Sequence, residues 1–140
     1  MKFISDNDSK DLNTFRRMII SEWGRVDSFD TENKGVKVPG PILAKEGEEV
    51  IGGVAFTWYK KPNKKDVGLW VNALYVVPSQ RNKGVGSKLL GLAMKNIDLG
   101  YGLFALTEKP ELYIQCGWSV LSQESSSYIL KYESRISIER

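Results

Sequence analysis

Apolar side chains recur at helical spacing near the N-terminus, and they predict an amphipathic helix over Asp8–Trp23. Asp8 or Ser9 can cap the start of this helix, and Gly24 ends it. The residues that share its apolar face are Leu12, Phe15, Ile19 and Trp23. The polar stretch that follows, Arg25–Lys37, predicts a loop or a short helix.

The middle of the chain alternates between apolar and polar residues, as half-buried strands do. A short strand is predicted over Ile42–Lys45, and two long antiparallel strands over Val50–Tyr59 and Asp66–Val77. In the first long strand, one face is expected to carry Val50, Gly52, Val54, Phe56 and Trp58. The segment Lys60–Lys65 joins the two long strands and predicts a solvated hairpin turn.

In the second half of the chain, the sequence pattern predicts helices that alternate with strands. Apolar residues recur at helical spacing from Val85 to Lys95. A short strand, a short helix and a terminal hairpin are then predicted over Gly102–Leu106, Pro110–Cys116, and Trp118–Leu121 with Ser127–Tyr132. The polar residues 133–140 are expected to fray. The order and the length of 140 residues predict an α+β fold in one domain, residues 1–140.

Composition narrows the chemistry that these elements can carry. The chain has no histidine, which excludes a histidine base or ligand, and no metal site is expected. The net charge is +3, and the positive residues are spread along the chain except for the cluster at Lys60–Lys65. Nucleic-acid binding usually needs a concentrated basic face, so it is the less favoured alternative function. Cys116 is expected to pack rather than act as a nucleophile. No apolar run is long enough to span a membrane and the N-terminus is too polar for a signal peptide, so a cytosolic location is expected.

The stretch Val76–Lys95 predicts an anion-binding site. An apolar strand runs into a turn that contains Gly84 and Gly86, and the turn opens directly into a helix. Backbone N–H groups at the start of a helix lack partners within it and lie at the positive end of its dipole, so they suit phosphate oxygens. Arg81 and Lys83 add cationic donors beside them.

Two of three phosphate-binding signatures fail on this turn. A nucleotide-triphosphatase loop needs Gly-Lys before Ser or Thr, but Gly86 is followed by Ser87 and Lys88. A dinucleotide fingerprint needs a third glycine where Leu89 stands. The remaining pattern, Gln-Arg-x-x-Gly-x-Gly over Gln80–Gly86 after LYVVP, resembles the acyl-CoA pyrophosphate loop of the GCN5-related N-acetyltransferase (GNAT) family.

A second motif supports the same resemblance. The sequence ELYIQCGWSVL, Glu111–Leu121, is similar to the tyrosine-bearing helix, Gly-aromatic pair and final hairpin of that family. Tyr113 and the pair Gly117-Trp118 stand at the corresponding positions. The two motifs together cover residues 69–121 and follow one another in the expected order.

The resemblance implies a mixed, mostly antiparallel central sheet of about six to seven strands with helices on both faces. In that fold the fourth and fifth strands, here Asp66–Val77 and Gly102–Leu106, splay apart, and acetyl-CoA lies in the gap as cosubstrate. Main-chain groups of Leu74, Tyr75 and Val76 would line the acetyl group and pantetheine, with the Val76 N–H donating to the thioester oxygen. The residues that would surround the pyrophosphate are Arg81, Asn82, Lys83, Gly84, Val85, Gly86 and Ser87.

The resemblance implies that an amine attacks the thioester directly in a ternary complex. Tyr113 is the candidate acid for the leaving thiolate, or a packing aromatic without a proton role. Many family members carry a glutamate base on the fourth strand, but here Asn72 is the only polar side chain of GLWVNALYVV besides the tyrosine. Glu22 and Glu108 are alternative bases or amine-orienting carboxylates, or else solvated surface residues. A water relay that touches Asn72 or a backbone carbonyl is a further alternative.

The predicted function is transfer of acetyl from acetyl-CoA to a primary amine of a small molecule or a peptide. A non-catalytic acyl-CoA-binding domain is the alternative that the missing strand carboxylate keeps open. The sequence leaves open the acceptor, the use of a longer acyl donor and the oligomeric state, a homodimer included.

Overall fold

The computed structural model describes residues 1–24, 32–33, 36–95 and 102–133. Within these residues, seven strands form one sheet in the order β1-β4-β5-β6-β7-β9-β8, and two short strands pair separately. The elements are β1 (Lys2–Ile4), α1 (Ser9–Trp23), β2 (Glu32–Asn33), β3 (Val36–Lys37), β4 (Ile42–Glu46), β5 (Glu49–Lys60), β6 (Val67–Val76), η1 (Pro78–Gln80), α2 (Val85–Lys95), β7 (Leu103–Thr107), α3 (Glu111–Gln115), β8 (Ser119–Glu124) and β9 (Ser127–Tyr132). The α+β architecture and the mixed, mostly antiparallel sheet predicted from the sequence are confirmed.

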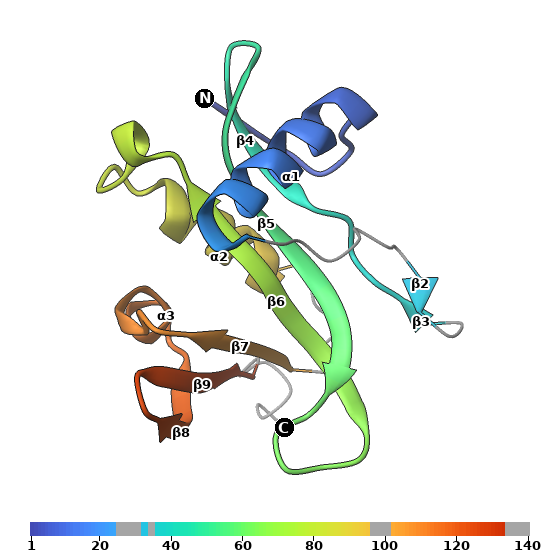
Figure 1. The fold of residues 1–140 in the computed structure, drawn as a ribbon, viewed down its shortest axis with the longest axis vertical. Coiled ribbons are helices and arrows are strands. Elements are labelled where there is room, and N and C mark those ends of the chain that lie inside the picture. Colours follow the sequence, from blue (N-terminus) through green and yellow to red (C-terminus); the bar gives the residue numbers. More distant parts are fainter. Residues whose placement is uncertain (25–31, 34–35, 96–101, 134–140) are drawn as a thin grey trace, which may run out of the picture.

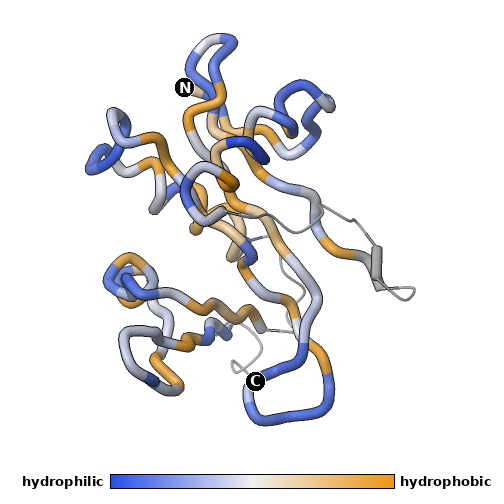
Figure 2. The backbone as a smooth tube through the Cα atoms, viewed as in Figure 1, coloured by the Kyte–Doolittle hydropathy of each residue, from blue (hydrophilic) through white to orange (hydrophobic). Residues whose placement is uncertain are grey.

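Helices cover both faces of the long central strands (Figure 1). On one face, Phe15 and Ile19 of α1 pack against β4, β5 and β6. Gly53 of β5 permits this close packing, because a Cβ there would lie 2.9 Å from the Phe15 ring. On the other face, the larger core includes Leu89 and Leu90 of α2 and side chains from β4, β5, β6, β7 and β9. Figure 2 shows hydrophobic colour along these strands and hydrophilic colour over the β5–β6 turn.

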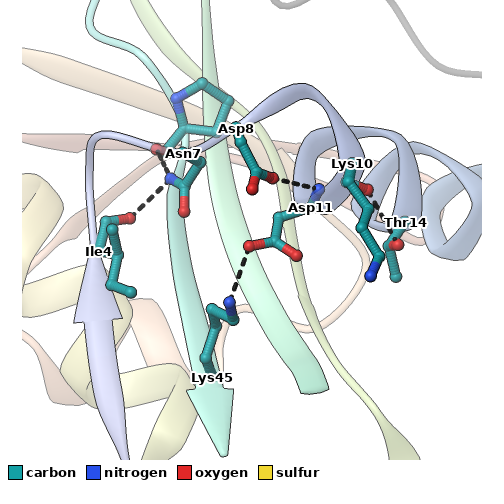
Figure 3. A network of polar contacts seen from close by, with 8 residues as sticks. Ile4, Asn7, Asp8, Lys10, Asp11, Thr14 and Lys45 are labelled. Carbon is teal, nitrogen blue, oxygen red and sulfur yellow. Dashed lines mark hydrogen bonds and ion pairs between the residues drawn. The ribbon is translucent and has the colours of Figure 1, made fainter. Parts of the chain in front are cut away.

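Polar contacts hold the start of α1 against β4 (Figure 3). Asp8 caps the helix by accepting a 2.9 Å hydrogen bond from the Asp11 N–H. Asp11 in turn pairs with Lys45 of β4 at 2.8 Å, and both side chains are largely buried. Asn7 donates to the Ile4 carbonyl at 2.8 Å, which links the strand before the helix to the same corner. The predicted helix, its Asp8 cap and its end at Gly24 are therefore confirmed.

A β-bulge in β5 changes the side of the sheet on which side chains lie. Ala44 pairs with Gly52 and Lys45 pairs with Val50, so Ile51 is an extra residue in β5. As a result Val50 packs in the α1 core, whereas Val54 lies in the α2 core. The prediction that Val50 shares a face with Val54, Phe56 and Trp58 is wrong, because the bulge interrupts the alternation.

The structure also adds elements that the sequence did not predict. β1 pairs antiparallel with β4, although its three residues are too few for a visible alternation. Within the predicted loop or short helix Arg25–Lys37, β2 and β3 pair antiparallel, and residues 25–31 and 34–35 lie outside the described part. Residues 134–140 of the predicted polar tail lie outside it too. In the described part of the chain, no helix combines the length and the apolar character needed to cross a membrane.

Candidate active site

β6 and β7 run parallel and pair only briefly. Within the described residues, their register joins Trp70 to Phe104 and Val71 to Ala105 and goes no further. β6 then continues to Val76, while β7 stays paired with β9 through Thr107. The two strands converge at one end and diverge towards α3 (Figure 1). The splay predicted between these strands is therefore present, and among residues 1–24, 32–33, 36–95 and 102–133 no strand pairs with this edge of β6 beyond Val71.

The contacts between β6 and β5 show which main-chain N–H and carbonyl groups of β6 point into the opening. The Val77 N–H donates to the Ile51 carbonyl at 2.9 Å, so Val77 faces β5. Main-chain groups alternate in direction along a strand, so those of Val76 and Leu74 point away from β5, into the opening. Those of Tyr75 point to β5, since a Cβ on Gly52 would lie 2.6 Å from the Tyr75 carbonyl oxygen. Of the three residues predicted to line the thioester, two thus present main-chain groups to the opening.

Asn72 occupies the point where β6 leaves β7. Ala55 pairs with Ala73 and Phe56 pairs with Val71, so Asn72 is the extra residue of a β-bulge. Its side chain is half-buried. The bulge follows directly after the last β6–β7 pair, and it therefore marks the inner end of the opening.

The loop after β6 leads straight into α2. Asn82 has φ +63° and Gly84 has φ +84°, so the chain turns through left-handed conformations before the helix. The Lys88 N–H donates to the Gly84 carbonyl at 3.0 Å, which is the first bond of the helix. The N–H groups of the three residues between them, Val85, Gly86 and Ser87, have no acceptor within the helix. These donors lie where the sequence predicts an anion site, and their N–H groups are of the kind that binds phosphate oxygens.

The cations of the loop differ in where they point. Lys83 is exposed, and so are Asn82 and Ser87. Arg81 instead turns back towards the strand, where its Nε donates to the Val76 carbonyl at 2.7 Å. Its guanidinium carbon lies 5.4 Å from the centroid of the Tyr75 ring. Arg81 is exposed as well, but its Nε is engaged with the strand.

Tyr113 lies in α3, next to the start of α2. Its side chain is 7% exposed, and its ring meets the Trp118 ring edge-on with centroids 5.1 Å apart. A Cβ on Gly86 would lie 3.2 Å from Cδ2 of Leu112, so α3 packs directly on the anion site. Burial raises the pKa of the Tyr113 phenol well above its ordinary value. The phenol therefore stays protonated across the physiological range and can donate a hydrogen bond.

The other titratable candidates are not buried beside the opening. Glu22 and Glu108 are both exposed. Cys116 is half-buried, and burial raises the pKa of its thiol, which opposes formation of a thiolate. Among the described residues, no group of three or more acidic or cysteine side chains could hold a metal ion.

The α1 side of the opening carries exposed apolar side chains, of which Trp23 can be named from the sequence as a candidate wall of an acceptor cleft or as a core residue. Trp23 at the end of α1 is 52% exposed and meets the Tyr75 ring edge-on at 6.0 Å. Leu106 of β7 is 61% exposed, and alternation puts it on the same face as Phe104. Phe104 stacks on Trp70 with centroids 5.2 Å apart, at the last pair before the strands diverge. No local sequence pattern marks Leu106, because its exposure depends on the splay.

Comparison with known proteins adds to this geometry. A family model described as the acetyltransferase (GNAT) domain matches residues 40–120. This span runs from just before β4 into β8 and includes the open edge, the loop and α3. A search of curated proteins finds no match.

Solved structures share the fold across nearly the whole chain. Arabidopsis thaliana Naa50 in complex with the bisubstrate analogue CoA-Ac-MVNAL matches with a TM-score of 0.67 and 17% identity, covering 95% of this chain and 98% of that one. Arabidopsis thaliana NAA60 in complex with acetyl-CoA matches with a TM-score of 0.66 and 18% identity, covering 95% and 99%. Escherichia coli ElaA matches with a TM-score of 0.69 and 11% identity, covering 95% and 100%. At these identities the likeness concerns the fold.

Proposed function

The chain belongs to the acetyltransferase (GNAT) domain family, and we propose that it transfers an acetyl group from acetyl-CoA to the primary amine of an acceptor with an apolar group near that amine. The observation that carries the proposal is the open edge of β6. Main-chain groups of Leu74 and Val76 point into the opening, and the strand leads within a few residues to unpartnered N–H groups at the start of α2. One extended ligand with a pyrophosphate and an amide-bearing arm fits both features.

Acetyl-CoA would bind by its pyrophosphate at the first N–H groups of α2, with Lys83 as an additional cation. The pantetheine arm would run from the pyrophosphate along the open edge and pair first with Val76, which is the residue nearer the loop, as an added strand does. The Leu74 N–H, further along the edge, would then donate to the thioester oxygen as negative charge develops on it, in place of the Val76 N–H expected from the sequence. Gly84 supports this arrangement because its Cβ position is open and its φ of +84° brings the main chain to the surface.

The transfer needs a neutral amine. A primary amine with pKa near 10 is only about one part in a thousand neutral at pH 7, which costs about 4 kcal/mol. The amine first loses a proton, its nitrogen then attacks the thioester carbon, and the carbon–sulfur bond breaks. The nitrogen loses a second proton, and the thiolate gains one to leave as free CoA. We propose that Asn72 orders the water that takes the first proton, since it stands at the inner end of the opening.

Tyr113 is the proposed partner of the leaving thiolate. Its phenol stays protonated because burial raises its pKa. A cysteine-like thiol has a pKa near 8.5, well below that of this phenol. The phenol therefore stabilises the thiolate by donating a hydrogen bond, and the final proton comes from water.

The acceptor would approach from the α1 face, where Trp23 and Leu106 expose apolar surface. A peptide whose first residue is apolar is the acceptor that we propose, and a small-molecule amine is the other class. The analogue CoA-Ac-MVNAL in the Naa50 structure, which has the same fold, supports a peptide. The cytosolic location and the oligomeric state stay predictions, which cell fractionation and sedimentation would test.

Calorimetric titration with acetyl-CoA, free CoA and ATP tests the cofactor. We expect both CoA species to bind and ATP to bind much more weakly, because the open edge selects the pantetheine arm. Gly84→Val should abolish binding, and Gly47→Val is its matched control. Both glycines have positive φ, +84° and +60°, with open space at the Cβ position, but Gly47 lies in the β4–β5 turn. Equal loss in both variants would assign the effect to stability rather than to the site.

Turnover tests the catalytic part of the proposal. Release of free thiol from acetyl-CoA should depend on enzyme and on an amine acceptor across a panel of peptides and polyamines. Tight acetyl-CoA binding without turnover on any amine would instead favour a non-catalytic acyl-CoA-binding domain.

A further inference from the structure

The α1-side face of the sheet continues beyond the strands on which α1 packs. Among the described residues, the buried members of the α1 core come from α1, β4, β5 and β6, and none comes from β7, β8 or β9. Leu103 and Ala105 of β7 lie in the α2 core, so Phe104 between them lies on the α1 side. Leu130 of β9 lies in the same α2 core, so Lys131 lies on the α1 side as well.

Two aromatic rings and a lysine cross this face from β6 to β9. Trp70 stacks on Phe104 with centroids 5.2 Å apart, and Nζ of Lys131 lies over the Phe104 ring, 5.6 Å from its centroid. The strand register gives the same order, because Phe104 pairs with Trp70 on one side and with Lys131 on the other. An ammonium group over an aromatic ring is attracted by the electron density of the ring. The Lys131 ammonium therefore lies over the face of the sheet.

Lys61 brings a second ammonium group to the same end of the face. A Cβ on Gly68 would lie 2.9 Å from Cε2 of Phe104 and 3.0 Å from Cγ of Lys61, so the stem of this lysine passes close to the ring. Lys61 belongs to the turn between β5 and β6, over which Figure 2 shows hydrophilic colour. The other lysines of this segment are exposed, and they are Lys60, Lys64 and Lys65.

Among the described residues, lysines outnumber carboxylates at this end of the face. Lys61 pairs with Asp66 at 3.1 Å, and Lys131 pairs with Glu133 at 3.4 Å. The side chains of the two carboxylates are 60% and 68% exposed, so water screens both pairs and each contributes little free energy. A carboxylate of a ligand can therefore replace Glu133 beside Lys131, and the surplus of positive charge attracts it.

Lys131 lies within reach of a peptide whose amine is at the inner end of the opening. Asn72 marks that end, and it lies two residues along β6 from Trp70. Neighbouring strands are about 4.8 Å apart and residues rise about 3.3 Å along a strand, so Lys131, two strands from Trp70, lies about 12 Å from Asn72. An extended peptide spans that distance with about three or four residues.

We propose that Lys131 selects acceptor peptides that carry an acidic side chain at about the third or fourth residue, with Lys61 and the other lysines of the β5–β6 turn adding to the attraction. The proposal rests on the acetyltransferase function above, and it adds a charge preference to the apolar preference at the first residue. The peptide would run from the opening across Leu106 and Phe104, with its carboxylate at the Lys131 ammonium. The same lysines would repel a polyamine.

Three peptides test the preference. They share a first methionine and differ only at the third and fourth residues, which are aspartate, asparagine or lysine. In the wild-type protein, kcat/KM should be about three- to fivefold higher for the aspartate peptide than for the asparagine peptide, the scale of an exposed ion pair. The lysine peptide should be the poorest of the three.

Variants of Lys131 assign this preference to its charge. Lys131→Met keeps a stem of similar length over Phe104 but removes the charge, and it should remove most of the difference between the aspartate and asparagine peptides. Lys131→Glu should place the lysine peptide above the aspartate peptide. Lys10→Met is the matched control, because it removes an exposed lysine from the start of α1, at the other end of that helix from Trp23. It should keep the wild-type order, and all variants should use the asparagine peptide equally.

Salt dependence gives a second measurement. The preference for aspartate should shrink as the salt concentration rises from about 0.01 M to about 1 M, because the Debye length falls from about 30 Å to about 3 Å. A preference that persists in Lys131→Met or at high salt would overturn the role of Lys131. Equal kcat/KM for the three peptides in the wild-type protein would overturn the charge preference but leave the enzyme function intact. No turnover with any peptide or amine would instead refute the enzyme function, and the proposal with it.

Discussion

The ring of Tyr113 meets the ring of Trp118 edge-on, with centroids 5.1 Å apart and 79° between their planes. The main chains of the two residues are also joined, since the Trp118 N–H donates to the Tyr113 carbonyl at 3.0 Å. Gly117 makes this turn possible with a φ of +95°. The indole of Trp118 in turn lies near the Tyr132 ring at 6.0 Å. Ring packing and a main-chain hydrogen bond therefore fix the position of Tyr113, which the proposed hydrogen bond to a leaving thiolate requires.

Tyr113→Phe should lower kcat by about tenfold while leaving the Kd for acetyl-CoA unchanged. General acids contribute about a hundredfold or more, but a thiolate is a stable leaving group and needs less help. The ring packing survives in phenylalanine, so the fold should be kept. Tyr132→Phe is the control, because that tyrosine also packs on Trp118. An unchanged kcat in Tyr113→Phe would assign Tyr113 to packing alone.

Unfolding at alkaline pH tests whether the Tyr113 phenol is buried in the folded protein. Burial raises the pKa of its phenol in the folded protein, so the unfolded chain ionises first, near pH 10. The contribution to stability is complete below that pH and falls as the pH rises towards the folded pKa, by roughly 1 kcal/mol per pH unit. Tyr113→Phe should remove this slope. Urea unfolding of both proteins between pH 9 and about 11 measures the difference, and equal slopes would mean that the phenol is solvated.

Gly84 and Gly86 should respond differently to alanine. Gly84→Ala places a Cβ in open space but at φ +84°, a left-handed conformation that costs about 1–2 kcal/mol. Gly86→Ala gains helix propensity, but its Cβ comes 3.2 Å from Leu112 of α3. We therefore expect Gly84→Ala to lower stability and Gly86→Ala to lower kcat by displacing the helix that carries Tyr113. Adding Leu112→Ala to Gly86→Ala should restore part of kcat, which steady-state kinetics would show.

The loop and helix that hold the proposed pyrophosphate site could be predicted because their signals are local. Gly84 and Gly86 lie within a few residues of Arg81, and α2 follows at once. The cap at Asp8 and the stop at Gly24 are local in the same sense. Each depends on residues that are close in sequence, so no knowledge of the fold is needed to find them.

The directions of side chains around the site could not be predicted, because bulges and strand pairing set them. The bulge at Ile51 sends Val50 to the α1 core, and the bulge at Asn72 interrupts β6. A bulge depends on register with a distant strand, which composition does not reveal. The turn of Arg81 back to Val76 and the exposure of Leu106 are likewise products of the splay.

The ion pair of Lys45 and Asp11 should stabilise the fold more than the pair of Lys61 and Asp66 in the β5–β6 turn. Its two side chains are 13% and 14% exposed, whereas those of Lys61 and Asp66 are 28% and 60% exposed. The hydrogen bond from Lys45 to Asp11 raises the pKa of that lysine. Its contribution is therefore complete at neutral pH and is lost as the pH rises through the raised pKa.

Lys45→Met should lower the Tm by several degrees at pH 7, and Lys61→Met should lower it little, because exposed pairs are worth little. Differential scanning calorimetry measures both. The gap between Lys45→Met and wild type should narrow as the pH rises above the ordinary lysine pKa, about 10.4. Equal shifts in the two variants at pH 7 would show that burial of the Lys45 pair adds no stability.

Trp23 and Leu106 should determine which acceptors are used. They come from α1 and from β7, on the same face of the sheet, and they are 52% and 61% exposed. A wild-type protein should acetylate peptides that begin with methionine or leucine faster than peptides that begin with serine, and faster than a polyamine. Leu106→Ala should lower kcat/KM for the apolar peptides by about tenfold, the effect of losing contact with a few methylene groups.

Val120→Ala is the matched control for this prediction, because Val120 is 44% exposed but lies on the edge strand β8. It should leave the acceptor ranking unchanged. Acetyl-CoA binding should be normal in both variants, because neither Leu106 nor Val120 lies on the loop before α2. A uniform fall across all amines in Leu106→Ala would indicate a distorted strand rather than a lost contact. A polyamine preferred over every peptide would show that the exposed apolar surface is not the acceptor site.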